Sequence, residues 1–405
     1  MASDTVYLDY AATTPLDPRV AEAMAMCLQR SGAFANPASQ HEPGLQAAAL
    51  VERARAHVAA LIKADPAEIV WTSCATESNN LAIKGAARFY KQRRGRHIVT
   101  VRTEHKSVLE ACIALEAEGF DIEFLETGAE GRVTVEQLQK TLREDTVLVS
   151  IMHANNETGV VQDIERLAPI VKANGSLLHV DAVQSAGRLT LDMQQWPVDL
   201  LSLSAHKLYG PKGVGALYVR ARPRVRLQAL LHGGDQEGRL RPGTVPTHQV
   251  VGMGEAYRLA AEEAEADNRR TAALKQRLWH RLVELDGVFR NGAEDACAPH
   301  IINLAFAGVH GEALAAELQG LAVASGSACT SASAAPSHVL RAMGVPDQLA
   351  HSSLRFSFGR FSTEQDVDDA VEIVRAGVER LRRFSPIWRA YRNGEALATL
   401  YDRAG

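Results

Sequence analysis

Four short segments of this sequence gather acidic, basic and amide side chains at high density. They are residues 103–106 (Thr-Glu-His-Lys), 153–159, 181–184 and 204–215. Each follows a short apolar run, and loops after the carboxyl ends of strands carry the functional groups of open α/β sheets. A lone Asp in such a loop is usually a helix cap, and a lone His is usually a satisfied surface group. Four such segments together favour one shared catalytic site.

The chemistry that these segments have in common is that of pyridoxal phosphate. This cofactor needs a lysine for a Schiff base, and Lys207 lies on a tight turn beside glycines. It needs a carboxylate that keeps the pyridine nitrogen protonated, a role that suits Asp181 at the end of an apolar strand. Its phosphate needs an anion cradle, which the helix after residues 72–77 offers, with Ser204 and His206 as added donors. The alternative is that Lys207 is a solvated surface lysine, which the other segments disfavour.

Alternating strands and helices would position these loops. Apolar runs of four to six residues predict strands over 97–101, 122–125, 147–152, 177–180, 200–203 and 216–219. Intervening helices indicate βα units and a mostly parallel sheet. Only a turn at 209–215 separates the last two strands, which is compatible with an antiparallel pair.

Apolar residues at helical spacing predict further elements and a second region. Helices over 19–31 and 107–118 would bury Cys27 and Cys112, and Val20, Met24 and Leu28 share the face of Cys27. A long amphipathic helix over about 255–285 precedes a second α/β region. We therefore expect a large α/β domain followed by a smaller one.

The cysteines do not form a metal or disulfide framework in the sequence. The five cysteines are Cys27, Cys74, Cys112, Cys297 and Cys329, and none pairs with another at CxxC spacing. Cys329 lies in a Ser/Gly/Ala stretch without helical or strand periodicity, where small side chains do not bury it firmly. A cysteine on such a tether suits a nucleophile that must reach a substrate and then present its sulfur elsewhere. The alternative is core packing.

Composition excludes several function classes. The chain has 405 residues, 46% apolar and 23% charged, with 44 Lys+Arg against 48 Asp+Glu. The net charge of −4 provides no global field for nucleic acid or an anionic membrane. No segment has the pattern of a transmembrane span, a signal peptide or a transit peptide, so we expect a cytoplasmic protein.

Several longer motifs resemble one enzyme family, the cysteine desulfurases of the NifS/IscS family. They include the stretches at 7–15, 75–78, 103–106, 155–157, 179–181, 204–207, 325–331 and 351–357. These are Tyr-Leu-Asp-Tyr-Ala-Ala-Thr-Thr-Pro, Ala-Thr-Glu-Ser, Thr-Glu-His-Lys, Asn-Asn-Glu, His-Val-Asp, Ser-Ala-His-Lys, Ser-Gly-Ser-Ala-Cys-Thr-Ser and His-Ser-Ser-Leu-Arg-Phe-Ser. The similarity runs almost to the end of the chain and is strongest to the housekeeping IscS-like group I enzymes.

This resemblance implies a fold and a site. The fold is the α/β fold type I of pyridoxal-phosphate enzymes (aspartate-aminotransferase-like), with a large mostly parallel sheet domain at 17–261 and a small domain of 1–16 and 262–405. The implied cofactor-binding residues are Lys207, Ala75, Thr76, His105, Asn156, Asp181, Gln184, Ser204, His206 and Thr244, the last reaching in from the partner subunit of a homodimer. His105 would stack on the ring and assist proton transfer, and Arg355 with Asn36 would bind the substrate carboxylate.

The resemblance also implies the reaction and its partners. Cys329 would take sulfur from L-cysteine as a persulfide and leave L-alanine, with Lys207 and His105 as the other catalytic residues. The sulfur would pass to an iron–sulfur scaffold protein and other acceptors, including those of tRNA thiolation. No resident metal is expected, although Cys329 would transiently contact a cluster on a scaffold. Direct nucleic-acid binding and membrane binding are not expected.

The sequence departs from the family pattern at a few positions. Cys74 stands where glycine is usual in the phosphate-binding turn, Ala205 replaces a glycine, Pro242 a serine and Val183 a threonine, and the tail at 395–405 diverges. Cys74 is either a second thiol near the cofactor or a small structural residue. Two rival functions stay open: an aminotransferase or β-lyase, and a catalytically silent relative that serves as a sulfur-network scaffold.

Overall fold

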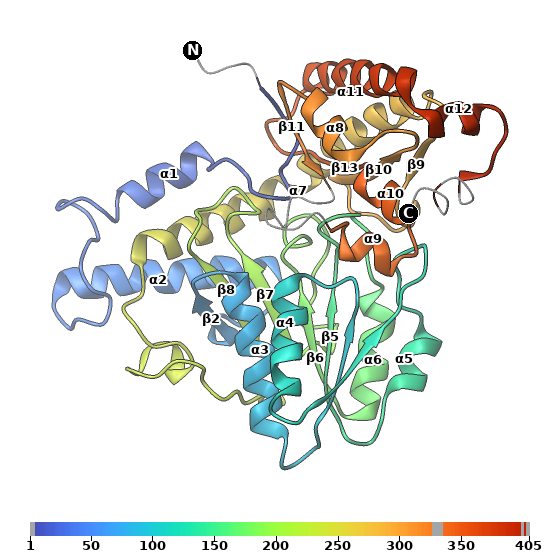
Figure 1. The fold of residues 1–405 in the computed structure, drawn as a ribbon. Coiled ribbons are helices and arrows are strands. Elements are labelled where there is room, and N and C mark those ends of the chain that lie inside the picture. Colours follow the sequence, from blue (N-terminus) through green and yellow to red (C-terminus); the bar gives the residue numbers. More distant parts are fainter. Residues whose placement is uncertain (1–4, 326–334, 398–400, 402–405) are drawn as a thin grey trace.

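The computed structural model describes residues 5–325, 335–397 and 401, and its two parts lie one above the other (Figure 1). Cys329, the predicted nucleophile, lies outside the described residues. Among the residues that are described, no helix combines the length and the apolar character needed to cross a membrane.

A seven-stranded sheet forms the larger part. Its strands are β2 (Ile69–Thr72), β3 (His97–Val101), β4 (Asp121–Leu125), β5 (Thr146–Met152), β6 (Leu177–Asp181), β7 (Leu200–Ser204) and β8 (Gly215–Val219). They lie in the order β2-β8-β7-β6-β5-β3-β4; β8 is antiparallel to both neighbours, and the other pairs are parallel. The predicted strands and the antiparallel final pair are confirmed, and β2 is a strand that the sequence analysis missed.

Two helices precede the strands of the large sheet, and the others fall between and after them. They are α1 (Pro18–Ala25), α2 (Glu42–Leu61), α3 (Ala75–Tyr90), α4 (Lys106–Glu116), α5 (Val135–Thr141), α6 (Ile164–Asn174), α7 (Thr247–Leu282), α8 (Gly311–Glu317), α9 (His338–Ala342), α10 (Asp347–His351), α11 (Glu364–Phe384) and α12 (Pro386–Arg392), with short 3₁₀ turns η1 (Pro66–Glu68) and η2 (Gln236–Arg239). The predicted helices at 107–118 and 255–285 correspond to α4 and α7, although α7 begins eight residues earlier than expected.

The helix predicted over 19–31 is wrong in its second half. α1 ends at Ala25, and the chain then turns back so that the amide of Ala33 donates to the carbonyl of Met26 at 3.1 Å. A Cβ at Gly32 would lie 1.8 Å from that carbonyl oxygen, so the turn requires glycine. Leu28, expected to be buried, is 63% exposed, whereas Cys27 is buried as predicted.

Both faces of the large sheet are covered along its central strands, which explains their continuous apolar runs, whereas Asp121 and Glu123 of the edge strand β4 are exposed. On one face Ile98 and Leu148 pack with Cys112 of α4 and with α3. On the other face Val99 and Val149 pack with α2, α6 and the first half of α7. Successive strand residues point to opposite faces, and a sheet buried on both sides therefore has no polar alternation. Cys112 is fully buried, as expected, and burial raises the pKa of its thiol to about 12.

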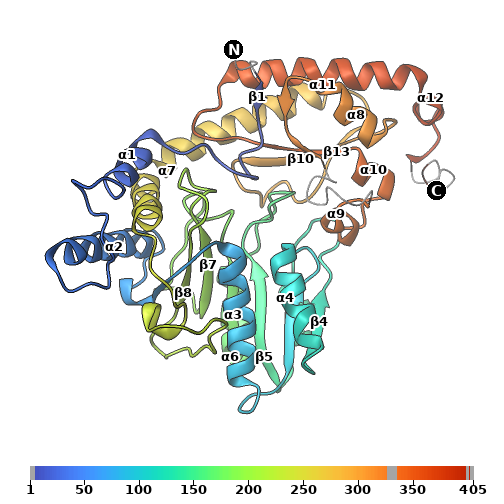
Figure 2. The same ribbon diagram turned by 60° about the vertical axis from the view of Figure 1, so that its left-hand side comes forward.

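The smaller part contains a second sheet. Its strands are β9 (Val288–Arg290), β10 (Ile301–Phe306), β12 (Ala324–Ser325) and β13 (Ser353–Ser357), in the antiparallel order β12-β13-β10-β9. α11 lies across its outer side, and α7 runs from the large sheet into this part (Figure 2). The second hydrophobic cluster joins Phe356 and Ile302 to Val374 of α11 and Leu278 of α7.

The N-terminal segment connects the two parts. β1 (Val6–Tyr7) pairs in parallel with β11 (Leu321–Ala322). The amide of Ala11 then donates to Ser357 Oγ at 2.8 Å, and Thr14 Oγ1 accepts from the amide of Tyr209 at 2.8 Å. Residues 6–14 therefore contact both the small sheet and the turn that carries Lys207.

A buried arginine cluster reinforces the same junction. Arg360, which follows β13, contacts Asp17 at 2.6 Å, Asp267 at 2.9 Å and Glu263 at 3.1 Å. Its guanidinium also lies over the ring of Tyr209, 4.5 Å from the centroid. Asp17 caps α1 and the two other carboxylates belong to α7, so one side chain links α1, α7, the small part and the lysine turn.

Candidate active site

The carboxyl ends of β3, β5, β6 and β7 surround one pocket with a volume of about 330 Å³. The pocket brings together ten of the residues expected from the sequence. They are Ala75, Thr76, His105, Asn156, Asp181, Gln184, Ser204, His206, Lys207 and Arg355. Asn36 and Thr244 do not line this pocket within the single chain; they line a second, smaller one together with Arg55 and Glu237.

Lys207 lies in the turn between β7 and β8. Its Nζ donates to the carbonyl oxygens of Ala11 and Ala12 at 2.6 and 2.7 Å. Two residues later Tyr209 has a φ of 60°, in the left-handed region that side chains seldom adopt. The hydroxyl of Tyr209 accepts hydrogen bonds from Arg188 Nη2 at 2.8 Å and from the amide of Arg360 at 2.6 Å, so tertiary contacts hold the turn in shape.

Asp181 ends β6 and is 5% exposed. One carboxylate oxygen accepts from Asn79 Nδ2 at 2.8 Å, and the other accepts from the amide of Val183 at 3.0 Å. These donors stabilise the ionised carboxylate and fix its direction at the wall of the pocket. A carboxylate held in this way can pair with a protonated ring nitrogen.

His105 caps α4, and its ring is open to the pocket. Its Nδ1 accepts from the amide of Ser107 at 3.1 Å. Burial of the ring by the surrounding protein lowers the pKa of His105, and the charge of Lys207 acts in the same direction. The preceding residue, Glu104, is fully buried, and burial raises its pKa well above the usual range. The side chain of Glu104 accepts from the amide of Met152 at 2.6 Å and so ties this loop to the end of β5.

The N-terminus of α3 forms an anion cradle. Its N-cap, Cys74, makes no side-chain capping bond, so Ala75 and Thr76 present their amides toward the pocket at the positive end of the helix dipole. A Cβ at Gly215 would lie 2.8 Å from the carbonyl carbon of Cys74 and 3.1 Å from the amide nitrogen of Ala75, so the cradle rests directly on β8. This explains why a glycine is needed at the start of that strand.

Two further groups face this cradle. Ser204 Oγ is buried and has no hydrogen-bond partner within the described residues. His206 Nδ1 lies 3.2 Å from Thr13 Oγ1, and burial lowers the pKa of His206 to about 4. A neutral imidazole and an unengaged hydroxyl beside free helix amides are suited to an anionic group such as a phosphate ester.

Arg355 of β13 enters the pocket from the small part. Its Nη1 donates to the carbonyl of Asn156 at 2.7 Å, and its Nη2 contacts Asp9 at 2.6 Å. Arg355 Nε is buried and has no partner in the part of the chain that the structure describes. The guanidinium is therefore fixed by two contacts while keeping donor capacity for a carboxylate.

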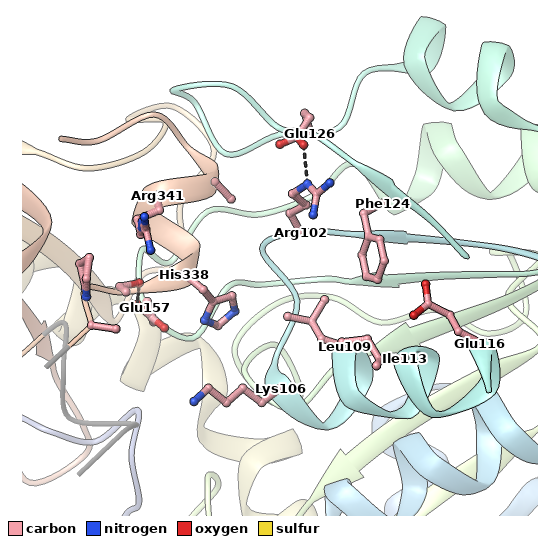
Figure 3. Close-up of a pocket in the computed structure, with 14 residues that line it drawn as sticks. Arg102, Lys106, Leu109, Ile113, Glu116, Phe124, Glu126, Glu157, His338 and Arg341 are labelled. Carbon is pink, nitrogen blue, oxygen red and sulfur yellow. Dashed lines mark hydrogen bonds and ion pairs between the residues drawn. The ribbon is translucent and has the colours of Figure 1, made fainter. Parts of the chain in front are cut away.

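A wider groove of about 880 Å³ lies beside the pocket, between α4 and α9. Figure 3 shows Leu109, Ile113 and Phe124 on one side of it and His338 with Arg341 on the other. Ser337 donates to Glu157 at 2.5 Å, and His338 contacts the carbonyl of Glu104 at 2.9 Å. These bonds attach α9 to the loops after β3 and β5.

Sequence reasoning missed several pocket residues, among them Asn79, Ser107 and Met152. Asn79 follows the cradle on the first turns of α3, and Ser107 is two residues beyond His105. The available signal was helical spacing: Asn79 is four residues from Ala75 and hence on the same face of the helix. The carbonyl oxygens of Ala11 and Ala12, which accept hydrogen bonds from Lys207, belong to the backbone, so no side chain in the sequence indicated their role.

Comparison with known proteins finds relatives that match the chain over almost its whole length. The aminotransferase class-V family matches residues 6–370. The chain is 55% identical over 396 residues to cysteine desulfurase IscS of Aeromonas hydrophila subsp. hydrophila, covering 98% of each chain. It is 54% identical to the protein of the same name from Vibrio vulnificus, again over 98% of each. A solved NifS-like protein has a TM-score of 0.84 at 36% identity, covering 94% of this chain and 98% of its own. Together with the fold, these matches show that the chain belongs to the class-V aminotransferase family and, within it, to the IscS cysteine desulfurases.

Proposed function

We propose that this cysteine desulfurase binds pyridoxal 5′-phosphate through Lys207, removes sulfur from L-cysteine to give L-alanine, and carries the sulfur as a persulfide on Cys329. The observation that carries the proposal is the meeting of Lys207, Asp181, His105 and the α3 cradle around one pocket, in a chain that shares 55% identity with an IscS relative.

The residues present fit the cofactor. The helix amides of Ala75 and Thr76 suit a phosphate, as does the Ser204 hydroxyl, which has no partner within the described residues, and the Asp181 carboxylate suits a pyridinium nitrogen. Asn156 and Gln184 would hold the side of the ring that carries the hydroxyl. When bound, the cofactor withdraws electrons from the amino acid attached to it.

The chain's own residues would then act in sequence. Arg355, oriented by its contacts with Asp9 and the carbonyl of Asn156, binds the substrate carboxylate. The Lys207 amine moves a proton at the substrate carbon. The Cys329 thiolate attacks the substrate sulfur: an S–S bond forms, the C–S bond breaks with its electron pair remaining on carbon, and that carbon takes up a proton to yield alanine.

The proposed working unit is a homodimer. Thr244 and Asn36 line a pocket separate from that of Lys207, which supports a composite site in which Thr244 contacts the phosphate bound by the partner protomer. We also propose the domain division 17–261 against 1–16 with 262–405. Within α7, Val250 and Met253 pack in the cluster of the large sheet and Leu278 in that of the small one, which supports a boundary inside this helix.

The proposed recipients of the persulfide sulfur are an iron–sulfur scaffold protein and other acceptors. The relatives are cysteine desulfurases, and the solved structure of one neighbour, SspA, is a complex with cysteine. This neighbour is 37% identical to the chain and covers 88% of it, with a TM-score of 0.77. These similarities support L-cysteine as the substrate.

The decisive experiment combines cofactor trapping with product analysis. Borohydride reduction of the yellow protein should label Lys207, and labelling of another lysine would refute the site. Incubation with cysteine should yield alanine and one added sulfur located on Cys329 by mass spectrometry. Pyruvate and ammonia would indicate a β-lyase, amino-group exchange an aminotransferase, and a colourless inert protein a silent relative.

A further inference from the structure

A chain of hydrogen bonds along the wall of the pocket connects Asp181 to His105 through two residues, Asn79 and Ser107, that the proposed function does not use. Asn79 Nδ2 donates to Asp181 Oδ2 at 2.8 Å and to Ser107 Oγ at 2.9 Å. Ser107 Oγ in turn lies 2.8 Å from His105 Nδ1. Asn79 and Ser107 are 1% and 8% exposed, so water does not compete for these bonds.

The direction of every bond in this chain follows from its acidic end. The carboxylate of Asp181 only accepts, so the side chain of Asn79 must turn its NH₂ group toward it. The second hydrogen of the same NH₂ group goes to Ser107 Oγ, which therefore acts as an acceptor there. The Ser107 hydroxyl hydrogen is then free to be donated to His105 Nδ1.

A second donor points at the same nitrogen. The backbone amide of Ser107 donates to His105 Nδ1 at 3.1 Å, and an amide N–H has no alternative role. His105 Nδ1 must therefore be unprotonated, and in the neutral ring the hydrogen is on Nε2. A proton added to Nδ1 would face two donors, so the geometry disfavours the imidazolium form.

The charged groups around His105 do not reverse the preference for its neutral form. Asp181 and Glu157 favour its protonation, whereas Lys207 and His338 oppose it, and burial is the largest influence on its pKa. The net pKa shift is downward.

The arrangement also has a structural cost. Asn79 Oδ1 is buried and has no hydrogen-bond partner within the described residues. The neighbouring positions Leu81, Ala82 and Ile83 on α3 are fully buried and apolar. An apolar residue at position 79 would avoid an unsatisfied acceptor, so the amide is retained for what its NH₂ group does.

We propose that Asn79 and Ser107 are positioning residues that hold His105 as the neutral Nε2–H tautomer, oriented by the Asp181 carboxylate. The inference rests on the proposed function and narrows it: His105 contributes a stacking surface and a hydrogen-bond donor, and Lys207 is the group that carries the substrate proton.

The test reads the tautomer directly, without turnover. The ¹⁵N and ¹H shifts of the ring of His105 are measured in the cofactor-free and the cofactor-loaded chain, together with a pH titration. We expect the wild type to show the Nε2–H tautomer. In Ser107→Ala and Asn79→Ala the ratio of Nε2–H to Nδ1–H should fall roughly two- to tenfold, the effect of one hydrogen bond, and the titration should move to higher pH. Ser107→Thr keeps the hydroxyl group and should therefore give the same His105 signals as the wild type.

A matched control is Ser150→Ala. Ser150 Oγ lies 2.8 Å from His179 Nδ1 in the buried sheet, which is the distance between Ser107 Oγ and His105 Nδ1. Neither Ser150 nor His179 lines the pocket. This variant should leave the signals of His105 unchanged.

If Asn79→Ala does not fold, Ser107→Ala, which keeps the backbone donor, is sufficient to test the proposal. An Nδ1–H tautomer in the wild type, or unchanged ratios in the variants, would overturn the proposal. Sulfur transfer to Cys329 is measured separately, so loss of the proposed function is distinguishable from loss of the tautomer.

Discussion

Arg360→Met is the substitution whose effect can be worked out most fully from the structure. The side chain of Arg360 is 10% exposed, and its guanidinium contacts Asp17 and Asp267, whose side chains are 3% and 9% exposed. Methionine keeps an apolar stem of similar length but removes the charge, together with the guanidinium that lies over Tyr209. Removing one partner of a buried ion pair leaves uncompensated charge and costs about 3–5 kcal/mol.

The lower end of this range applies because both carboxylates keep another partner. Asp17 retains Arg19 at 2.8 Å and Asp267 retains Arg270 at 3.2 Å. The entropy of unfolding is about 2.1 cal/mol/K per residue, or roughly 0.85 kcal/mol/K for a chain of this length. A loss of about 3 kcal/mol should therefore lower the Tm by about 3.5 °C. The control is Arg269→Met, which removes an ion pair to Glu265 between side chains that are 72% and 84% exposed and should lower the Tm by less than about 1 °C.

The dependence on pH provides an independent check, measured by differential scanning calorimetry at one scan rate. Hydrogen bonds from Arg19 first, and from Arg360 among others, lower the pKa of Asp17 to about 2. A depressed carboxyl pKa contributes stability that is complete above the unfolded pKa of about 3.9 and is lost as the pH falls through the folded value. The gap between wild type and Arg360→Met should hence be full near neutral pH and narrow between about pH 4 and pH 2. Equal Tm losses in Arg360→Met and Arg269→Met, or a gap that does not change in acid, would refute the reasoning.

Three further predictions concern the chemistry. Cys329→Ser should stay yellow and bind cysteine yet release almost no alanine, since a hydroxyl does not replace a thiolate near neutral pH; sulfur transfer by this variant would contradict the mechanism. Cys112→Ser should keep its activity but lose about 1–3 kcal/mol of stability in denaturant unfolding, because the substitution buries a hydroxyl in the core. A large loss of turnover per folded molecule would contradict a purely structural role for Cys112. Mixing a Thr244→Ala protomer with a Lys207→Ala protomer should restore up to one working site per heterodimer, and an active monomer at low concentration would exclude the composite site.

The strands of the large sheet were predictable because burial on both faces leaves a continuous apolar run. The ranges expected for 97–101 and 200–203 agree with β3 and β7 to within one residue. β2 was missed because it is four residues long and its last residue, Thr72, belongs to the polar segment 72–77 that was assigned to the cradle. The end of α1 was missed because its apolar spacing continues to Leu28, whereas the backbone turns at Gly32.

In the site, loops with several reactive side chains were predictable and single supporting residues were not. Lys207 and Asp181 follow apolar strands and have specific chemistry, so their types and places were informative. Asn79 resembles any polar residue on a helix, and only the fold shows that its amide lies between Asp181 and Ser107. The pairing of Arg355 with Asp9 joins residues 346 positions apart, which no local pattern indicates.

The position of residues 6–14 has a consequence for how the chain matures during synthesis. This segment is made long before its partners Leu321, Arg355 and Ser357, and the pairs Asp9–Arg355 and Ala11–Ser357 are each 346 positions apart. Since non-local contacts form only after the intervening chain is available, the carbonyls that hold the Lys207 amine stay without their tertiary support until these partners have been made. Nascent chains should therefore fold the large sheet first, while competence to capture the cofactor follows only after the strand that carries Arg355 and Ser357 has been made.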